Sequence, residues 1–315
     1  QAPMLLETVM DYGGNYNVSV TVNPAKLEDA EGSLDFSGLK GEFKVAKGGT
    51  KVTGDAHAQS LSMNTKDTNL QFNNFSSAVD QSTNAHGLWI GKSDAKIETI
   101  NAQTAMGEFS INGVSMDADT AEQNDTLNYL LNLVVAEVIS PEGFPLAPQS
   151  MNYQIKFTNI DSAAVAQLSE ALQEMQRQIP TNTPEQNEVL GQEFGMQNIG
   201  AIDQMLYANP AMAQNLNIDT NQGPVKVDFN LDVSGFPQDQ SVKELMSPME
   251  LVRYMTGSLD AKVPMAVIMM TPLGQQLQAY QQQGLVKVDG DTAQLQANLK
   301  DGQLMVNDNP MPLPF

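Results

Sequence analysis

This 315-residue chain is poor in the thiol and imidazole side chains that usually bind transition metals and often act in catalysis. The chain has no cysteine and two histidines, His57 and His86, both in polar segments rich in turn-forming residues. A zinc or redox-metal site would have to depend mainly on carboxylates, which is not how such sites are usually built. The sequence therefore predicts no metal or other cofactor, and both histidines are interpreted as structural.

Two aspartate pairs have a spacing that could bind Ca²⁺ or share a proton. Asp117 with Asp119, and Asp289 with Asp291, each place two carboxylates two residues apart. We prefer a structural interpretation, because both pairs lie where turns favour aspartate for backbone reasons.

The tripeptide Gly91-Lys92-Ser93 is similar to the end of a phosphate-binding loop. That motif requires glycine at the position of His86 and a helix after the serine, whereas the residues that follow alternate like a strand. The sequence also lacks a G-x-S-x-G elbow and a G-x-G-x-x-G motif that opens a helix. We therefore expect a protein that is not an enzyme.

Methionine is the residue type that best suggests a binding surface. The chain has 18 methionines, and their flexible, polarizable side chains can line an adaptable apolar groove. The residues predicted to bind an apolar ligand are Met265, Val267, Met269 and Met270. The alternative is ordinary core packing beside a strand.

Most elements available to form such a surface are predicted to be β-strands with one wet face. From Val225 to Val233 every odd position is apolar and every even position is polar. Side chains alternate sides along a strand, so this pattern indicates an antiparallel sheet that packs on one face. The alternation recurs at Tyr16–Val22, Met151–Phe157 and Ala293–Leu299.

The region before residue 150 is predicted to be a β meander with tight turns. Gly113 interrupts the alternation of its strand, which indicates a bulge. The run from Leu127 to Val138 fits either a helix or a strand, and its β-branched residues favour a strand. The other expected strands are Ser33–Phe36, Glu42–Ala46, Asn69–Phe72, Lys96–Ile100 and Gly107–Met116.

Four helices are predicted in the second half of the chain, after Asp161, Thr183, Ser247 and Thr271. In the last three a hydroxyl residue precedes proline, which combines a good N-cap with a residue suited to the first helical turn. Gly284 should end the fourth helix. We expect these helices to pack on one face of the sheet.

The C-terminal region is predicted to form a three-stranded meander over Leu285–Asp289, Thr292–Lys300 and Gln303–Asn307. Asp289-Gly290 and Asp301-Gly302 stand at its junctions, and Asp-Gly favours type I′ turns. The tail Asn309–Phe315 contains three prolines and is expected not to extend a sheet.

Composition and charge exclude several classes of protein. Hydrophobic residues make up 41% of the chain, which is too much for intrinsic disorder. The net charge of -21 repels phosphate backbones, so nucleic acid is not an expected partner. We predict a β-rich α+β fold of long antiparallel meandering sheets, with about four helices on one face. Residues 1–150 would form the β meander and 151–315 the strand-helix region, or the two would form one continuous domain.

The order of several short motifs resembles that of the YdgA-like family, Gram-negative bacterial proteins of unknown function. The motifs are Gly87-Leu88-Trp89-Ile90-Gly91, the segment Tyr153–Ala163, Leu259–Pro264, Gln283-Gly284-Leu285-Val286 and Asp301–Asn307. The family favours Asn-Gly after the last strand, where this chain has Asn307-Asp308. The resemblance implies a periplasmic protein tethered to the inner membrane by an N-terminal segment absent from this chain, and it assigns no catalytic residue.

Two functions are compatible with these observations. The first is a non-enzymatic envelope binding module that holds a lipid or other apolar ligand on a curved sheet. The alternative is a structural or interaction protein that self-associates as a homo-oligomer or docks a partner at its sheet edges.

Overall fold

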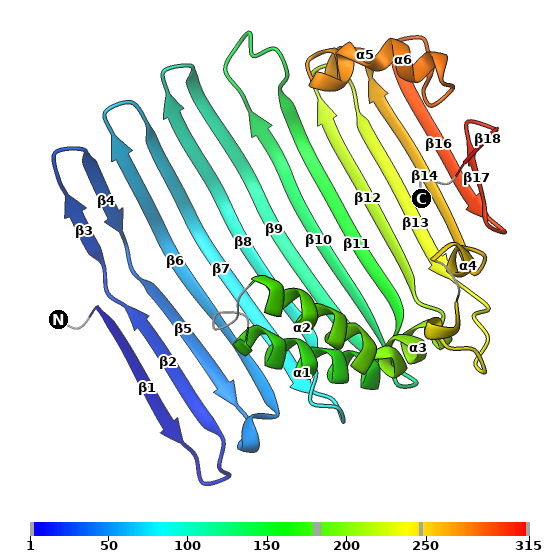
Figure 1. Cartoon of the computed structure of the whole chain (residues 1–315). Coiled ribbons are helices and arrows are strands. Elements are labelled where there is room, and N and C mark those ends of the chain that lie inside the picture. Colours follow the sequence, from blue (N-terminus) through cyan, green and yellow to red (C-terminus); the bar gives the residue numbers. More distant parts are fainter. Residues whose placement is uncertain (1–2, 179–183, 246–247, 313–315) are drawn as a thin grey trace.

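One antiparallel sheet of eighteen strands dominates the molecule (Figure 1). The structure is a computed structural model, and it describes residues 3–178, 184–245 and 248–312. The strands are β1 (Met4–Met10), β2 (Tyr16–Val22), β3 (Ala25–Glu28), β4 (Gly32–Phe36), β5 (Leu39–Val45), β6 (Lys51–Thr65), β7 (Asn69–Thr83), β8 (Trp89–Thr104), β9 (Gly107–Gln123), β10 (Thr126–Ile139), β11 (Pro148–Asp161), β12 (Ala211–Thr220), β13 (Val225–Val233), β14 (Met255–Pro264), β15 (Lys287–Asp289), β16 (Thr292–Lys300), β17 (Gln303–Val306) and β18 (Asn309–Met311).

The strands pair largely in chain order, so the predicted antiparallel meander is confirmed. From β6 to β13 each strand pairs with the strand before it and the strand after it. The pairing of β10 with β11 joins the regions before and after residue 150 in one sheet. At the C-terminal end β14 pairs with β16 along nearly its whole length. Strands β15 and β17 also pair with β16, each near one of its two ends.

The alternation located strands well but did not give their lengths. The strand at Val225–Val233 has the predicted bounds, and the ambiguous run from Leu127 to Val138 is a strand, as expected. The predicted strand at Asn69–Phe72 is only the first part of β7, which extends to Thr83. In β6 to β9 alanine, serine and glycine take many of the positions on the less polar side of the strand. The difference in hydrophobicity between the two sides, which marks a strand in the sequence, is therefore weak there.

The irregularity predicted at Gly113 is confirmed, but it is not a one-residue bulge, because the register of β9 with β10 is the same on both sides of Gly113. Gly113 has φ +64°, and the pairing of β9 with β10 is interrupted between the pairs Val114–Val135 and Asn112–Glu137. In β7, Asn74 has φ +54° where the pairing with β8 is also interrupted. The left-handed conformation favours glycine and asparagine, so these residue types fit the irregularity.

Gly113→Ala is expected to lower the free energy of unfolding by about 2 kcal/mol. The alanine would have to adopt the positive φ of Gly113, and its Cβ would lie 2.9 Å from the Ala136 Cβ. Urea denaturation measures the change. Gly191→Ala is the matched control, because Gly191 lies in a helix with nothing within 4 Å of the added Cβ. Equal stabilities for the two variants would contradict a conformational requirement at Gly113.

The helices are α1 (Ser162–Gln178), α2 (Pro184–Gln197), α3 (Ile199–Tyr207), α4 (Pro248–Val252), α5 (Met265–Met269) and α6 (Leu277–Gln282). Helix α1 follows β11 directly, as predicted after Asp161, and it packs against α3. Helices α2 and α4 begin at the expected prolines, whereas the predicted caps Thr183 and Ser247 lie outside the described residues. None of the helices in the described ranges combines the length and hydropathy that a membrane crossing requires.

The single helix predicted from Thr271 to Gly284 is wrong. That segment forms a short 3₁₀ helix, η4 (Pro272–Gln275), followed by α6. The Thr271 side chain makes no capping hydrogen bond to the helix; its hydroxyl donates to the carbonyl of Ile268 at 2.8 Å. Both ends of the predicted helix are correct, since η4 begins at Pro272 and Gly284 has φ +75° just after α6.

Two predictions for the C-terminal strands are also wrong. The Asp289-Gly290 junction is not a type I′ turn, because only Gly290 has positive φ, whereas both Asp301 and Gly302 have it. The tail does extend the sheet, since Asn309–Met311 forms β18 and pairs with β17. Pro310 is tolerated there because β18 lies at an edge, where a missing N–H breaks no ladder.

Candidate functional site

The two faces of the sheet differ sharply in charge. Residues directly opposite each other on paired strands share a face, so the registers trace rows of side chains across the sheet. One row on the first face is Leu6, Val20, Gly41, Ala56, Ser77, Ala95, Met116, Leu133, Tyr153, Leu216, Val227, Ala261 and Leu295. The next is Thr8, Val18, Phe43, Gly54, Val79, Ser93, Ala118, Leu131, Ile155, Gln214, Phe229, Leu259, Ala297 and Val306.

We call this side of the sheet the apolar face, defined by these two rows and the flanking rows through Val225 and Leu231. The four rows, traced from β1 to the C-terminal strands, contain no charged side chain. The opposite face carries the charges. One of its rows places Glu42 opposite Asp55, Asp94 opposite Asp117, and Asp228 opposite Asp260.

The apolar face is not sealed by a second layer. Large side chains in the middle of its rows, such as Leu133, Tyr153 and Phe229, remain partly exposed. In the two central rows only Gly41, Ala56 and Val306 are fully buried. A sheet face covered by another layer would bury most of these side chains.

The total surface supports the same conclusion. The chain exposes 19356 Å², whereas a compact monomer of 34.1 kDa would expose about 12,800 Å². The described part of the chain has nine fully buried apolar residues, several of them in or beside the helices. The molecule is therefore a broad single sheet with a small helical cluster, and much of its apolar surface lies open.

The predicted methionine cluster lies at the end of a strand and not within the four rows. Met265, Val267 and Met269 belong to α5, which follows β14 and packs against β14 and η4 (Figure 1). Met265 and Val267 are half-buried, while Met269 and Met270 are 62% and 49% exposed. The sequence analysis proposed a curved sheet as the binding surface but named none of the residues of the apolar face, although the alternation that marks this face was visible in β13.

A shallow hollow of about 610 Å³ lies across β6 to β9, where Asn74 and Gly113 interrupt the strand pairing. His57 and Lys96 line it, and the amide of Asn74 donates to the carboxylate of Glu98 beside them. His57 pairs with Ser76, which in turn pairs with Lys96, so the two basic groups are two strands apart, or roughly 10 Å. They do not converge on one point, so the hollow holds no arrangement typical of catalysis.

The aspartates considered as metal ligands do not form a cluster. Contrary to the sequence interpretation, Asp117 and Asp119 lie within β9 and not in a turn. Asp119 forms an ion pair with Lys92 at 3.7 Å. Within residues 3–178, 184–245 and 248–312, no group of three or more histidine, aspartate or glutamate side chains could hold a metal ion.

Among the residues that the structure describes, two titratable groups have shifted pKa values, and both shifts have a structural cause. Hydrogen bonds from Asn15, led by its side-chain amide at 2.9 Å, lower the pKa of Asp11 in the turn after β1. Burial raises the pKa of the Tyr207 phenol, which donates to the carbonyl of Gln240 at 2.8 Å. The nearby carboxylates of Asp203, Glu244 and Asp239 also raise the pKa of Tyr207.

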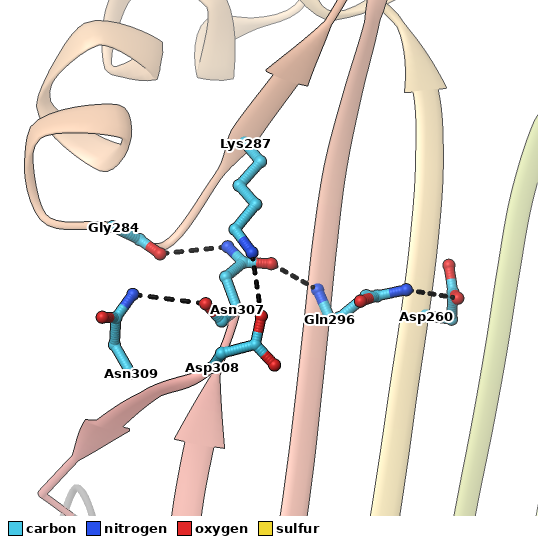
Figure 2. A network of polar contacts seen from close by, with 7 residues as sticks. All are labelled: Asp260, Gly284, Lys287, Gln296, Asn307, Asp308 and Asn309. Carbon is cyan, nitrogen blue, oxygen red and sulfur yellow. Dashed lines mark hydrogen bonds and ion pairs between the residues drawn. The ribbon is translucent and has the colours of Figure 1, made fainter.

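A polar network joins C-terminal segments that are distant in sequence (Figure 2). Asn307 is only 4% exposed, and its side-chain amide donates to the carbonyl of Gly284 at 3.0 Å. Its side-chain oxygen accepts the N–H of Gln296 at 3.0 Å. The Gln296 side chain in turn donates to Asp260 at 3.1 Å, so three of the motif segments meet here.

The network explains the turn at Asn307-Asp308. Both residues have positive φ, at 48° and 69°, as a two-residue type I′ turn between β17 and β18 requires. Lys287 forms an ion pair with Asp308 at 3.1 Å across this turn. The motif residues therefore fasten the last strands to the sheet, and nothing in their geometry requires a ligand.

Comparison with known proteins assigns a family and no activity. The model of the family described as a bacterial protein of unknown function (DUF945) matches residues 1–314. No curated protein and no solved structure matches the chain.

Proposed function

Because the chain belongs to this bacterial family of unknown function, we propose a function from its structure: a non-enzymatic module that binds a lipid or similar apolar ligand. The observation that carries the proposal is the open, charge-free apolar face. A stable sheet normally buries its apolar face against another layer. Here a bound ligand supplies part of that missing layer.

The chemistry of the face favours acyl chains over a protein partner. A protein–protein interface has a polar rim and about one hydrogen bond per 100–200 Å². The four rows extend over eleven to fifteen paired strands and seven residues, or roughly 60 Å by 20 Å. Such a surface offers large apolar area and few directional groups, which suits flexible hydrocarbon.

The location of the protein and of its helices belongs to the same proposal. Because the order of motifs resembles that of YdgA-like proteins, we infer a periplasmic body tethered to the inner membrane. In the same proposal the helices pack on the apolar face of the sheet and cover part of the bound ligand. The contacts of α1 and α3 with β11, and of α5 with β14, support this arrangement. Met265, Val267 and Met269 of α5, together with the adjoining Met270, would then close one end of the binding surface.

Native mass spectrometry combined with lipid extraction tests the proposal. Protein purified from bacterial membranes in a mild detergent should retain lipid, and the delipidated protein should bind a fluorescent fatty acid saturably. Absence of both copurified lipid and fatty-acid binding would contradict the proposal.

A second function, docking at a sheet edge, is favoured by one specific observation. All seven residues of β1 are exposed, although the strand is paired with β2 along its whole length. An exposed edge strand can pair with another chain. This function is compatible with ligand binding, because it uses the edge of the sheet and not its face.

A further inference from the structure

The two outer edges of the sheet are built differently. Strand β1 at the N-terminal edge has seven residues, with large exposed apolar side chains on both of its faces. These side chains are Met4 (58%), Leu5 (49%), Leu6 (59%), Val9 (64%) and Met10 (63%). The strand contains no lysine, proline or bulge, the usual devices that protect an edge from pairing.

The remaining edge strands are protected. Strand β18 has three residues including Pro310, and β15 has three residues with two charged side chains, Lys287 and Asp289. Strand β3 has four residues, of which Lys26 and Glu28 are charged. Short, charged or proline-containing strands make poor templates for another chain. A head-to-tail contact between β1 and the opposite edge is therefore disfavoured, and the best complement of β1 is β1 itself.

The hydrogen-bonding pattern fixes which groups of β1 are available. The N–H of Asn23 donates to the carbonyl of Pro3 at 3.1 Å, so the odd-numbered residues of β1 direct their backbone groups toward β2. The backbone groups of the even-numbered residues consequently point away from the sheet. Those residues are Met4, Leu6, Thr8 and Met10.

We propose that β1 is a self-association edge, at which two copies of this chain pair antiparallel about a two-fold axis centred on Leu6. A two-fold axis at Glu7 would place two carboxylates directly opposite each other, which is unfavourable. With the axis at Leu6, the two leucines face each other and Thr8 pairs with Met4 of the second copy. The apolar face then continues without a charge from one copy to the next. The inference rests on the edge-docking function and not on ligand binding.

Light scattering and edge variants test the pairing. In light scattering the full chain should have the mass of a dimer, twice the 34.1 kDa of the single chain. Thr8→Pro should raise the dissociation constant of the dimer by about tenfold or more. The proline removes an N–H that points away from β2, so the pairing of β1 with β2 should survive. Thr8→Ala is the matched control, because it retains that N–H and should remain dimeric. A wild-type protein that is monomeric throughout, or a fully dimeric Thr8→Pro variant, would overturn the proposal.

Cross-linking tests the register and does not depend on the proline variant. The chain has no cysteine, so Leu6→Cys introduces a single thiol. Hydrogen-bonded partners lie about 5.5 Å apart between Cα atoms, within disulfide reach, so oxidation should give a covalent dimer. Asn309→Cys, at the opposite edge, should not cross-link; the reverse result would refute β1 pairing. Fatty-acid binding by monomeric Thr8→Pro separates the two functions, since it is expected whether or not β1 pairs.

Discussion

Asn307→Ala is expected to lower the free energy of unfolding by about 3 kcal/mol, a large share of the stability of a typical domain. The substitution leaves the carbonyl of Gly284 and the N–H of Gln296 without their side-chain partner in a buried site. Each unsatisfied buried group costs about 1–3 kcal/mol. Alanine is also less tolerant than asparagine of φ +48°. Urea denaturation measures the global loss, and hydrogen exchange of the Gln296 amide measures the local one.

Asn309→Ala is the matched control for this prediction. Asn309 is exposed, and its side chain donates one bond, to the carbonyl of Asn307 at 3.3 Å. Its removal should change stability by less than about 0.5 kcal/mol. Similar losses in the two variants would show that the Asn307 network is not what fastens the C-terminal strands.

The double variant Leu216→Asp with Val227→Asp is expected to weaken fatty-acid binding by about tenfold or more. Leu216 and Val227 are direct partners on β12 and β13, in a central row of the apolar face. Two carboxylates there would be desolvated by a bound acyl chain, which opposes binding. Titration of the delipidated protein with a fluorescent fatty acid gives the dissociation constants.

A matched pair on the other face controls for charge and for strand stability. Asn217 and Lys226 are direct partners on the same two strands, and both are exposed. Asn217→Asp with Lys226→Asn changes the net charge by the same amount as the double aspartate variant. Its binding should stay close to that of the wild type, provided that circular dichroism shows both variants folded. Equal losses from both faces would indicate a charge effect and would remove the apolar face as the binding surface.

Local patterns determined much of the secondary structure. The period-two alternation of Val225–Val233 predicted a strand with one wet face, because side chains on a strand alternate sides whatever its neighbours. The interruption at Gly113 and the Asp301-Gly302 turn were also predictable, since positive φ favours a few residue types. The helix after Asp161 followed from its spacing of apolar residues.

Other features depended on which segments meet. The tail was expected to leave the sheet because proline cannot donate to a ladder, yet Pro310 lies at an edge where no donor is needed. The helix expected from Thr271 to Gly284 breaks into two short pieces, which local capping signals did not reveal. The partners of Asn307 lie in segments far from it in sequence.

The sequence by itself determined that many strands have one apolar side, and it contains no recognised catalytic motif. It could not show that those sides align into one charge-free face, because alignment depends on the register of each pair, and a one-residue slip would reverse it. Nor could it show that the face stays open and that β1 lies at an unprotected edge. Only the tertiary structure decided these points, because burial and edge position depend on which elements pack together.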